Sequence, residues 1–520
     1  MPDGVTKTFW RNWRFWLIAA ISAGLAWRLT DYFLRFPVWD DEASLGLNIM
    51  HHSYTGLLHP LQYNQVCPIG FLWISKFIIQ YCGTGVWALR GLPLLAGIAA
   101  VLSAWPIFKS FGGRRVGLLA TALIACSLAT NRFGTDFKPY SLDLLLALCI
   151  VGLTLRAIRR PGDYRPVVGI ALLTPIAIAF SYPSMFVLGA ALVAQAPALW
   201  QRRRQASRAI YIGWAMILAG SVAAVYFGVI RGQMNHTNSF MQKFWQSAFP
   251  PHGLAIVGWL IHAHVSNMMS YPFGGSQGIA LAIAPLVALG LLRLWRKRRW
   301  AELTLLAGPF VLTFLAAYLH KYPYGADARV EQHLVPSIAL LAALGAVTLC
   351  AALIRKSRNI NIWRNAANIP VAVMVLFALF MIGKDIRFPW RTPAPLVAQR
   401  FITRVFAHAG PHTHIVLLNQ HPFRYSVLLS WQLVTQRHPV IIGPDLRMLP
   451  RLAAVGSYWL VQFHFSSAEP IAAQTLQQFR HALRHGIISA DITRRLVEPF
   501  SGFRPVYMQE VHITSAPNPQ

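Results

Sequence analysis

The sequence is short of charge, and above all of negative charge. Only 12% of its 520 residues are charged, about half the share found in an average soluble domain. There are 17 acidic residues against 47 basic ones, which gives a formal net charge of +30 at pH 7. Hydrophobic residues make up 55% of the chain. This composition excludes an ordinary soluble domain and indicates a polytopic membrane protein.

Several familiar motifs are also missing. Five cysteines are too few for a disulfide framework, and spacing does not decide whether Cys67 and Cys82, in one predicted external loop, form a bond. The chain has no HExxH, no Gly-rich phosphate loop and no serine nucleophile elbow. Its scattered histidines lack the spacing of a closed zinc site. The sequence therefore predicts no cofactor, and a divalent metal stays open without support from ligand spacing.

Apolar runs long enough to cross a bilayer dominate the first three quarters of the chain. They predict about 11 transmembrane helices, near residues 15–34, 87–108, 116–131, 141–158, 167–181, 184–200, 209–230, 277–294, 301–319, 332–354 and 369–384. The first run lacks a convincing cleavage site and is interpreted as an uncleaved span. Basic residues cluster in alternate loops, as at 156–165 and 202–208. By the positive-inside rule those loops and the N-terminus are cytoplasmic, and an odd span count leaves the C-terminus outside.

The composition changes after Lys384. A proline-rich linker at 387–395 precedes short β-rich runs at 415–418, 440–442 and 458–463, separated by helical patterns such as 472–483. Strands alternating with helices predict a small α/β domain. We expect two domains: a transmembrane catalytic domain over 1–384, with a long external loop at 31–89, and an external α/β domain over 390–520.

Acidic residues gather on the predicted external side. Before residue 385 that side holds Asp31, Asp40, Asp41, Glu42, Asp136, Asp143, Asp327 and Glu331, against Asp3, Asp163 and Glu302 on the cytoplasmic side. Asp40, Asp41 and Glu42 are consecutive, just after the first span. Adjacent anions raise one another's pKa, which suits proton abstraction or the holding of a cation. A solvated helix start, capped by these side chains, is an equally simple reading.

Two further external motifs pair charge with aromatic or proline residues. Asp136 and Lys138 lie at a span boundary, where Lys138 offers a cation to a phosphate; the alternative is a snorkelling pair beside a helix start. Arg329 follows Tyr322 and Tyr324 in a later external loop. Its planar guanidinium suits phosphate oxygens, as in an anionic lipid headgroup; the alternative is a loop anchored by interfacial tyrosines.

These motifs, in this order, resemble the GT-C glycosyltransferases, in particular the bacterial branch allied to protein O-mannosyltransferases and the lipid A aminoarabinose transferase. Trp39-Asp40-Asp41-Glu42-Ala43 resembles the Asp-Glu motif after span one. Tyr63-Asn64-Gln65-Val66-Cys67-Pro68 resembles the loop segment Gln-x-Ala-Pro, with Cys67 in place of Ala. Trp87–Pro93 resembles the opening of the second span, and Asp136-Phe137-Lys138-Pro139-Tyr140 the acidic-x-Arg-Pro-Tyr element, with Lys for Arg. Tyr322-Pro323-Tyr324-Gly325 through Arg329 resembles the late-span element, with extra residues before the Arg. The resemblance covers about residues 15–350.

The resemblance implies a polyprenyl-phosphate-linked sugar donor and transfer to an acceptor hydroxyl on a glycan, lipid or protein, at the external face of the inner (plasma) membrane and with inversion. It assigns the role of base to Asp41. Asp40 is an extra acid that shifts or shares that role, and Glu42 orients the acceptor or the loop. Lys138 and Arg329 are the candidates for the donor phosphate. Asp136, Tyr63, Gln65 and Tyr324 complete the predicted substrate-binding set.

Two other classes of protein remain as alternatives. A transporter or lipid flippase uses external carboxylates as cation or proton sites, but such proteins place acids near the membrane midplane and contain repeats. A non-catalytic assembly factor built on the C-terminal domain leaves the three loop motifs without a purpose. The sequence does not determine the sugar, the acceptor, the polyprenyl length or the oligomeric state.

Overall fold

The computed structural model describes residues 12–200, 205–274, 277–356 and 367–390, and beyond these 395–396, 399, 414–417, 427–428, 431, 435, 440–442, 458–464, 489–498 and 506–514. The chain forms two compact units. The first comprises Met1–Arg35 and His52–Pro389, and the second comprises Phe36–His51 and Trp390–Gln520. The segment Phe36–His51, which contains the three adjacent acids and was predicted to be external, therefore belongs by its contacts with the C-terminal part of the chain.

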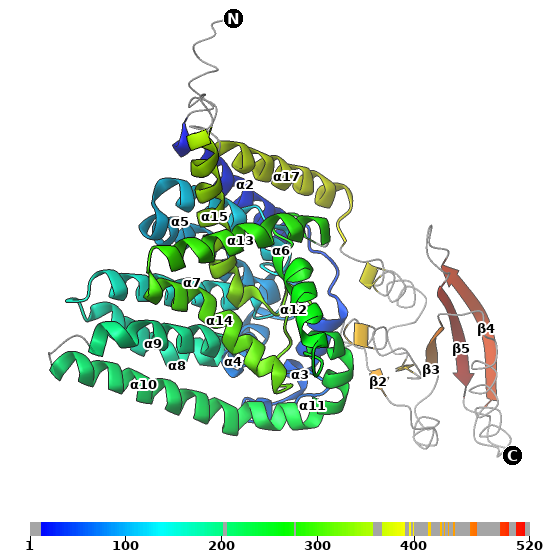
Figure 1. Cartoon of the computed structure of the whole chain (residues 1–520). Coiled ribbons are helices and arrows are strands. Elements are labelled where there is room, and N and C mark those ends of the chain that lie inside the picture. Colours follow the sequence, from blue (N-terminus) through cyan, green and yellow to red (C-terminus); the bar gives the residue numbers. More distant parts are fainter. Residues whose placement is uncertain are drawn as a thin grey trace, which may run out of the picture. The chain divides into compact units, whose positions relative to one another are not determined.

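The first unit is helical throughout its described part (Figure 1). Its helices are α2 (Trp13–Phe33), α4 (Ile69–Cys82), α5 (Val86–Ala125), α6 (Leu128–Arg132), α7 (Tyr140–Arg159), α8 (Arg165–Phe180), α9 (Ser184–Trp200), α10 (Gln205–Val225), α11 (Arg231–Phe244), α12 (Ala255–Val265), α13 (Gln277–Arg296), α14 (Trp300–Tyr318), α15 (Val335–Lys356) and α17 (Asn368–Arg387). One π turn, Tyr226–Ile230, joins α10 to α11, and the 3-10 turn η5 (Gln332–Leu334) precedes α15.

Helix α5 contains two of the predicted spans. Gly113 interrupts it with φ 80° and ψ −172°, a conformation that favours glycine. A Cβ atom on Gly117 would lie 3.0 Å from the Trp105 ring, although twelve residues of straight helix extend ~18 Å. The chain therefore reverses direction at Gly113, where basic residues had predicted a loop.

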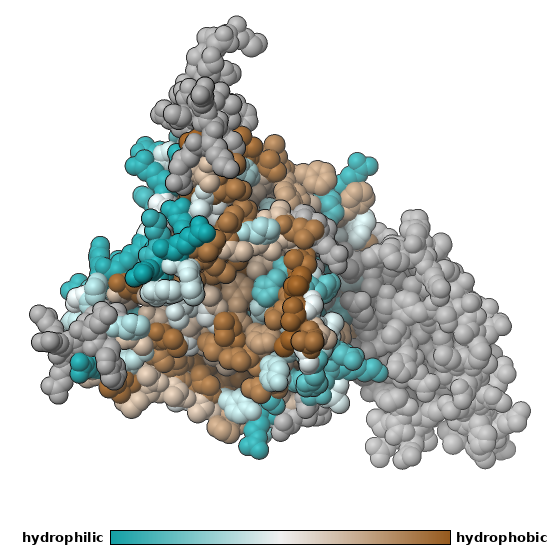
Figure 2. Space-filling view, in the orientation of Figure 1, coloured by the Kyte–Doolittle hydropathy of each residue, from teal (hydrophilic) through white to brown (hydrophobic). Residues whose placement is uncertain are grey.

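Six helical segments of the described chain are long and apolar enough to cross a membrane: Val86–Ala125, Tyr140–Arg159, Arg208–Met234, Trp300–Tyr318, Gln332–Ile354 and Asn368–Arg387. Hydrophobic residues cover much of the visible face of this unit (Figure 2). The prediction of a helical, multi-pass membrane protein is confirmed, whereas the number of 11 spans stays a prediction. Helix α4 has 14 residues and at ~21 Å is too short to span ~30 Å of hydrocarbon.

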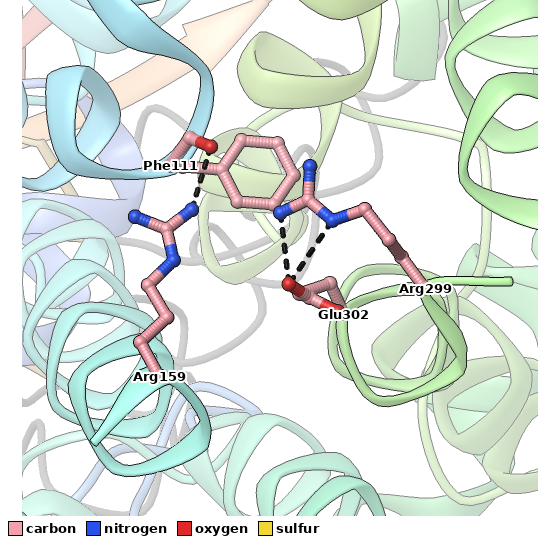
Figure 3. Close-up of polar contacts among 4 residues, drawn as sticks. All are labelled: Phe111, Arg159, Arg299 and Glu302. Carbon is pink, nitrogen blue, oxygen red and sulfur yellow. Dashed lines mark hydrogen bonds and ion pairs between the residues drawn. The ribbon is translucent and has the colours of Figure 1, made fainter. Parts of the chain in front are cut away.

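On the predicted cytoplasmic side, three helices meet around Phe111 (Figure 3). Arg159 donates to the Phe111 carbonyl at 2.6 Å, and Arg299 forms an ion pair with Glu302 at 2.8 Å. The Arg299 guanidinium also lies 4.9 Å from the centroid of the Phe111 ring. Arg159 thus links α7 to α5, and Arg299 links the start of α14 to the same residue of α5.

In the second unit, the described strands form one mixed sheet in the order β2-β1-β3-β5-β4. The strands are β1 (His414–Leu417), β2 (Val440–Ile442), β3 (Tyr458–His464), β4 (Ser489–Glu498) and β5 (Val506–Thr514). β1 runs parallel to β2 and β3, and β5 is antiparallel to β3 and β4. The three predicted strands are confirmed as β1, β2 and β3. The predicted helix 472–483 lies outside the described residues, so the α/β character of 390–520 stays a prediction.

Candidate functional site

The three adjacent acids form the first turn of helix α3 (Asp40–His51). Glu42 is fully buried and its carboxylate accepts a hydrogen bond from the Trp39 backbone N–H at 3.2 Å. This contact satisfies a donor at the helix start, as a capping side chain does. Asp40 and Asp41 are partly exposed. The local structure thus gives Glu42 a role in shaping the turn, while Asp40 and Asp41 stay partly exposed.

The second group joins two sequence motifs. The Lys138 ammonium donates a hydrogen bond to Gln65 Oε1 at 2.6 Å, and Gln65 Nε2 donates to the Tyr63 carbonyl at 3.1 Å. Lys138 is only 6% exposed and Gln65 7% exposed. Tyr63 and Asn64 have φ values of 58° and 53°, so the chain turns sharply just before Gln65. The structure therefore brings Tyr63, Gln65 and Lys138 together, with a buried positive charge facing a neutral amide.

The backbone beside this group is held by a residue of α11 and by a residue of the turn between α8 and α9. The Cys67 N–H donates to Gln233 Oε1 at 3.2 Å, and the Tyr182 hydroxyl donates to the Cys67 carbonyl at 3.0 Å. Burial raises the pKa of the Cys67 thiol to about 12, Lys138 opposes that shift and Asp143 adds to it. Cys67 and Cys82 are both free thiols, the first buried and the second exposed. Cys67 is therefore part of the packing around Lys138.

Asp136 is fully buried, two residues from Lys138. Its carbonyl accepts a hydrogen bond from the Lys138 N–H at 2.7 Å, which closes a tight turn ahead of α7. Phe137, between them, packs its ring 5.6 Å from that of Phe71 on α4. The acidic-x-Lys-Pro-Tyr segment is therefore inside the unit, not a solvated snorkelling pair.

The third group surrounds Arg329. Its Nε lies 3.1 Å from Asp327 Oδ2, and its guanidinium carbon lies 5.3 Å from the centroid of the Trp245 ring. The Arg329 side chain is 13% exposed. Tyr324, buried in the same loop, shares a hydrogen bond of 3.1 Å with His264 Nε2 on α12. The loop thus holds the Arg329 guanidinium beside the Trp245 ring and keeps Tyr324 buried.

Glu331 lies buried at the end of this loop and holds its backbone. It is 1% exposed and its carboxylate accepts a hydrogen bond from the Gly325 N–H. Burial raises the pKa of Glu331 to about 8, the Gly325 hydrogen bond opposes that shift and Asp327 adds to it. Burial also raises the pKa of Tyr322, with Asp143 and Glu331 adding to the shift. Tyr322 therefore lies within electrostatic reach of both the Arg329 loop and the start of α7.

One basic residue of this region was not predicted from the sequence. Partial burial lowers the pKa of Arg132, at the end of α6; Asp327 opposes that shift and Arg329 adds to it. Arg132 and Arg329 thus lie within electrostatic reach of each other despite their distance in sequence. The signal that points to Arg132 is its place: it is an arginine on the predicted external side, against the positive-inside trend.

The site residues divide between the two units. Asp40, Asp41 and Glu42 belong to the second unit, and Tyr63, Gln65, Asp136, Lys138, Tyr324 and Arg329 belong to the first. Within the first unit, Lys138 meets Gln65 as a pair, and Arg329 meets Asp327 as another. In the described part of the chain, no three His, Cys, Asp or Glu side chains converge as metal ligands.

Residues 66–227 match the family model "Dolichyl-phosphate-mannose-protein mannosyltransferase". Among solved structures, the chain is similar to ArnT from Cupriavidus metallidurans bound to undecaprenyl phosphate, at 13% identity and a TM-score of 0.56, covering 95% of this chain and 98% of that one. It is similar to the apo state of the same protein at 12% identity and a TM-score of 0.57, covering 96% and 97%. No curated protein matches. The resemblance predicted from the sequence is confirmed: the chain shares the fold of ArnT over nearly its whole length, and residues 66–227 match the mannosyltransferase family model.

Proposed function

We propose that this protein transfers a sugar from a polyprenyl-phosphate donor to an acceptor hydroxyl at the external face of the membrane, with inversion at the anomeric carbon. The family match and the fold support a membrane glycosyltransferase, and ArnT, which shares the fold, is known bound to undecaprenyl phosphate. In this proposal residues 1–384 form the catalytic membrane domain of an inner-membrane protein with a cytoplasmic N-terminus. Residues 390–520 form an external α/β domain.

The reaction is a single displacement. The acceptor oxygen attacks the anomeric carbon and forms a new glycosidic bond, while the bond from that carbon to the phosphate oxygen breaks. The electron pair leaves with the polyprenyl phosphate, and the acceptor proton goes to a carboxylate. A base within hydrogen-bond reach contributes ~10²–10⁴-fold to such a step.

The observation that carries the proposal is the buried Lys138 ammonium. Its hydrogen-bond acceptor is the neutral amide oxygen of Gln65 at 2.6 Å, and a buried cation is stabilised chiefly by an opposite charge. A donor phosphate supplies that charge, and its negative charge grows as the leaving group departs. Fixed cations at such a place are a large source of transition-state stabilisation. Arg329, joined by Arg132, is the second phosphate ligand.

Asp41 is the base in this proposal. Asp40, also partly exposed, tunes the charge of the turn, and Glu42 holds it through the Trp39 N–H. Gln65 and Tyr63 fix the direction of the Lys138 ammonium. Asp136 and Tyr324 line the substrate region from the loops that carry Lys138 and Arg329.

The test compares Asp41→Asn with Asp40→Asn in purified protein supplied with a polyprenyl-phosphate sugar and acceptor. We expect Asp41→Asn to lower the rate of polyprenyl phosphate release by ~10²–10⁴-fold while the protein still binds donor. Asp40→Asn keeps a measurable rate. If Asp41→Asn turns over normally and Asp40→Asn is inactive, the base is Asp40. If both are fully active, this turn takes no part in the chemistry.

A further inference from the structure

Helix α3 has a glycine in its interior, at position 46. Glycine in a helix interior is less favourable than alanine by ~0.8–1.0 kcal/mol. Gly46 lies one turn after Glu42, so the two residues share a face of the helix. A glycine on a buried face of a helix, where it weakens the helix, indicates that another group occupies the space that a larger side chain would fill.

That group is the indole of Trp431, in the same compact unit. A Cβ atom at position 46 would overlap Cζ3 of Trp431 and lie 2.9 Å from its Cη2. Trp431 is 3% exposed, and Val427 and Leu428 beside it are each 1% exposed. The Thr435 hydroxyl donates a hydrogen bond to the Trp431 carbonyl at 2.8 Å. The edge of the indole therefore lies directly against the α3 backbone, inside a packed core.

We propose that Trp431 is a positioning residue for the first turn of α3. Through this contact the C-terminal part of the chain fixes the positions of the Asp40 and Asp41 carboxylates, which makes it a component of the catalytic apparatus. This inference rests on the proposed function. Position 46 is five residues, or ~7.5 Å along the helix axis, from Asp41. A shift of α3 at Gly46 is therefore transmitted to the carboxylates, because an intact helix moves as a rigid rod.

The size of the effect follows from the overlap. Carbon atoms pack at ~3.5–4.0 Å, so a methyl group at position 46 displaces α3 or the indole by about one ångström. Misplacement of a reacting group by ~1 Å costs on the order of a hundredfold in rate. The loss falls on kcat, since α3 holds the proposed base, whereas the proposed phosphate ligands Lys138 and Arg329 are not part of α3.

The test is a steric complementation between Gly46→Ala and Trp431→Phe. Phenylalanine lacks the outer ring edge that meets Gly46, so it vacates the space that the new methyl group needs. We expect Gly46→Ala to lower kcat roughly tenfold to a hundredfold with little change in donor KM. The double variant Gly46→Ala/Trp431→Phe recovers most of the rate. If Gly46→Ala is as active as the parent protein, or if the double variant is no better than Gly46→Ala, the inference is overturned.

A second measurement needs no activity. Hydrogen exchange of the α3 amides reports how firmly the helix is held, and we expect the exchange to speed up by about tenfold or more in Trp431→Ala. Unchanged exchange overturns the positioning role even where the Gly46→Ala protein does not fold. A parent protein that transfers no sugar but shows this exchange response overturns the proposed function and leaves the contact in place.

Discussion

Replacement of Lys138 by methionine removes the charge and keeps an unbranched side chain that is one atom shorter. Lys138 is 6% exposed, and its ammonium lies 2.6 Å from Gln65 Oε1. A hydrogen bond to a charged group contributes about 1.5–3 kcal/mol, which corresponds to roughly a tenfold to hundredfold change in rate or affinity. Because the group is buried, salt screens its interaction only weakly. We expect Lys138→Met to lose ten- to a hundredfold in kcat/KM at both low and high ionic strength.

Much of this loss falls on kcat. The donor phosphate is a diester with one negative charge, and the released polyprenyl phosphate gains a second, so a fixed cation stabilises the transition state more than the bound donor. The assay follows polyprenyl phosphate release by purified protein over a range of donor concentrations. Lys76→Met is the matched control: Lys76 is 9% exposed and lies 5.8 Å from the Tyr54 ring. Its variant retains activity within about threefold, because Lys76 is not among the residues proposed to bind the phosphate.

Three results refute the reasoning. Normal kcat/KM in folded Lys138→Met means that the ammonium does not contact the phosphate. Equal losses in Lys138→Met and Lys76→Met mean that the assay reports folding. A loss that disappears at high salt also contradicts the buried position of the charge, because only exposed ions are screened effectively.

Two further predictions concern the Arg329 loop. We expect Arg329→Ala to lower kcat/KM for the lipid-linked donor by about tenfold or more. The control is Arg299→Ala, which also removes an arginine that is paired with an acid and lies over an aromatic ring, and which should leave kcat/KM nearly unchanged. Equal losses in the two variants contradict a role of Arg329 in phosphate binding. Burial raises the pKa of Glu331 from 4.5 to about 8 in the folded protein. Between pH 4.5 and about pH 8 the folded state therefore binds more protons than the unfolded state. The free energy of unfolding accordingly falls as the pH rises from about 5 to 8. Glu331→Gln, which keeps an acceptor for the Gly325 N–H, flattens this dependence of the melting temperature; an unchanged slope shows that Glu331 is not its source.

The membrane class and most helices follow from local sequence. Continuous apolar runs bounded by basic clusters predict helices because each span must satisfy its own backbone hydrogen bonds in lipid. Thus 141–158 and 301–319 coincide with α7 and α14 to within a residue or two. Helix α3 begins at Asp40, as its acidic first turn indicates. The motif order was likewise enough to predict the glycosyltransferase resemblance.

Contacts between distant segments needed the tertiary structure. Gln65 and Lys138 are 73 residues apart, and their pairing depends on how α4 and α7 are brought together. Arg132 and Arg329 become neighbours only when α6 and the loop before α15 approach each other. The same is true of Gly46 and Trp431, whose contact assigns α3 to the C-terminal unit.

Sequence pattern therefore determined which segments are helices and which residue types stand at their outer ends, because hydrophobicity, capping and turn formation act between near neighbours along the chain. It did not determine which ends meet. That choice depends on packing between side chains far apart in sequence, where a single glycine or a buried amide decides how closely two segments approach. For this protein only the tertiary structure showed that Lys138 donates to the neutral amide of Gln65, and that the Trp431 indole packs against α3 at Gly46.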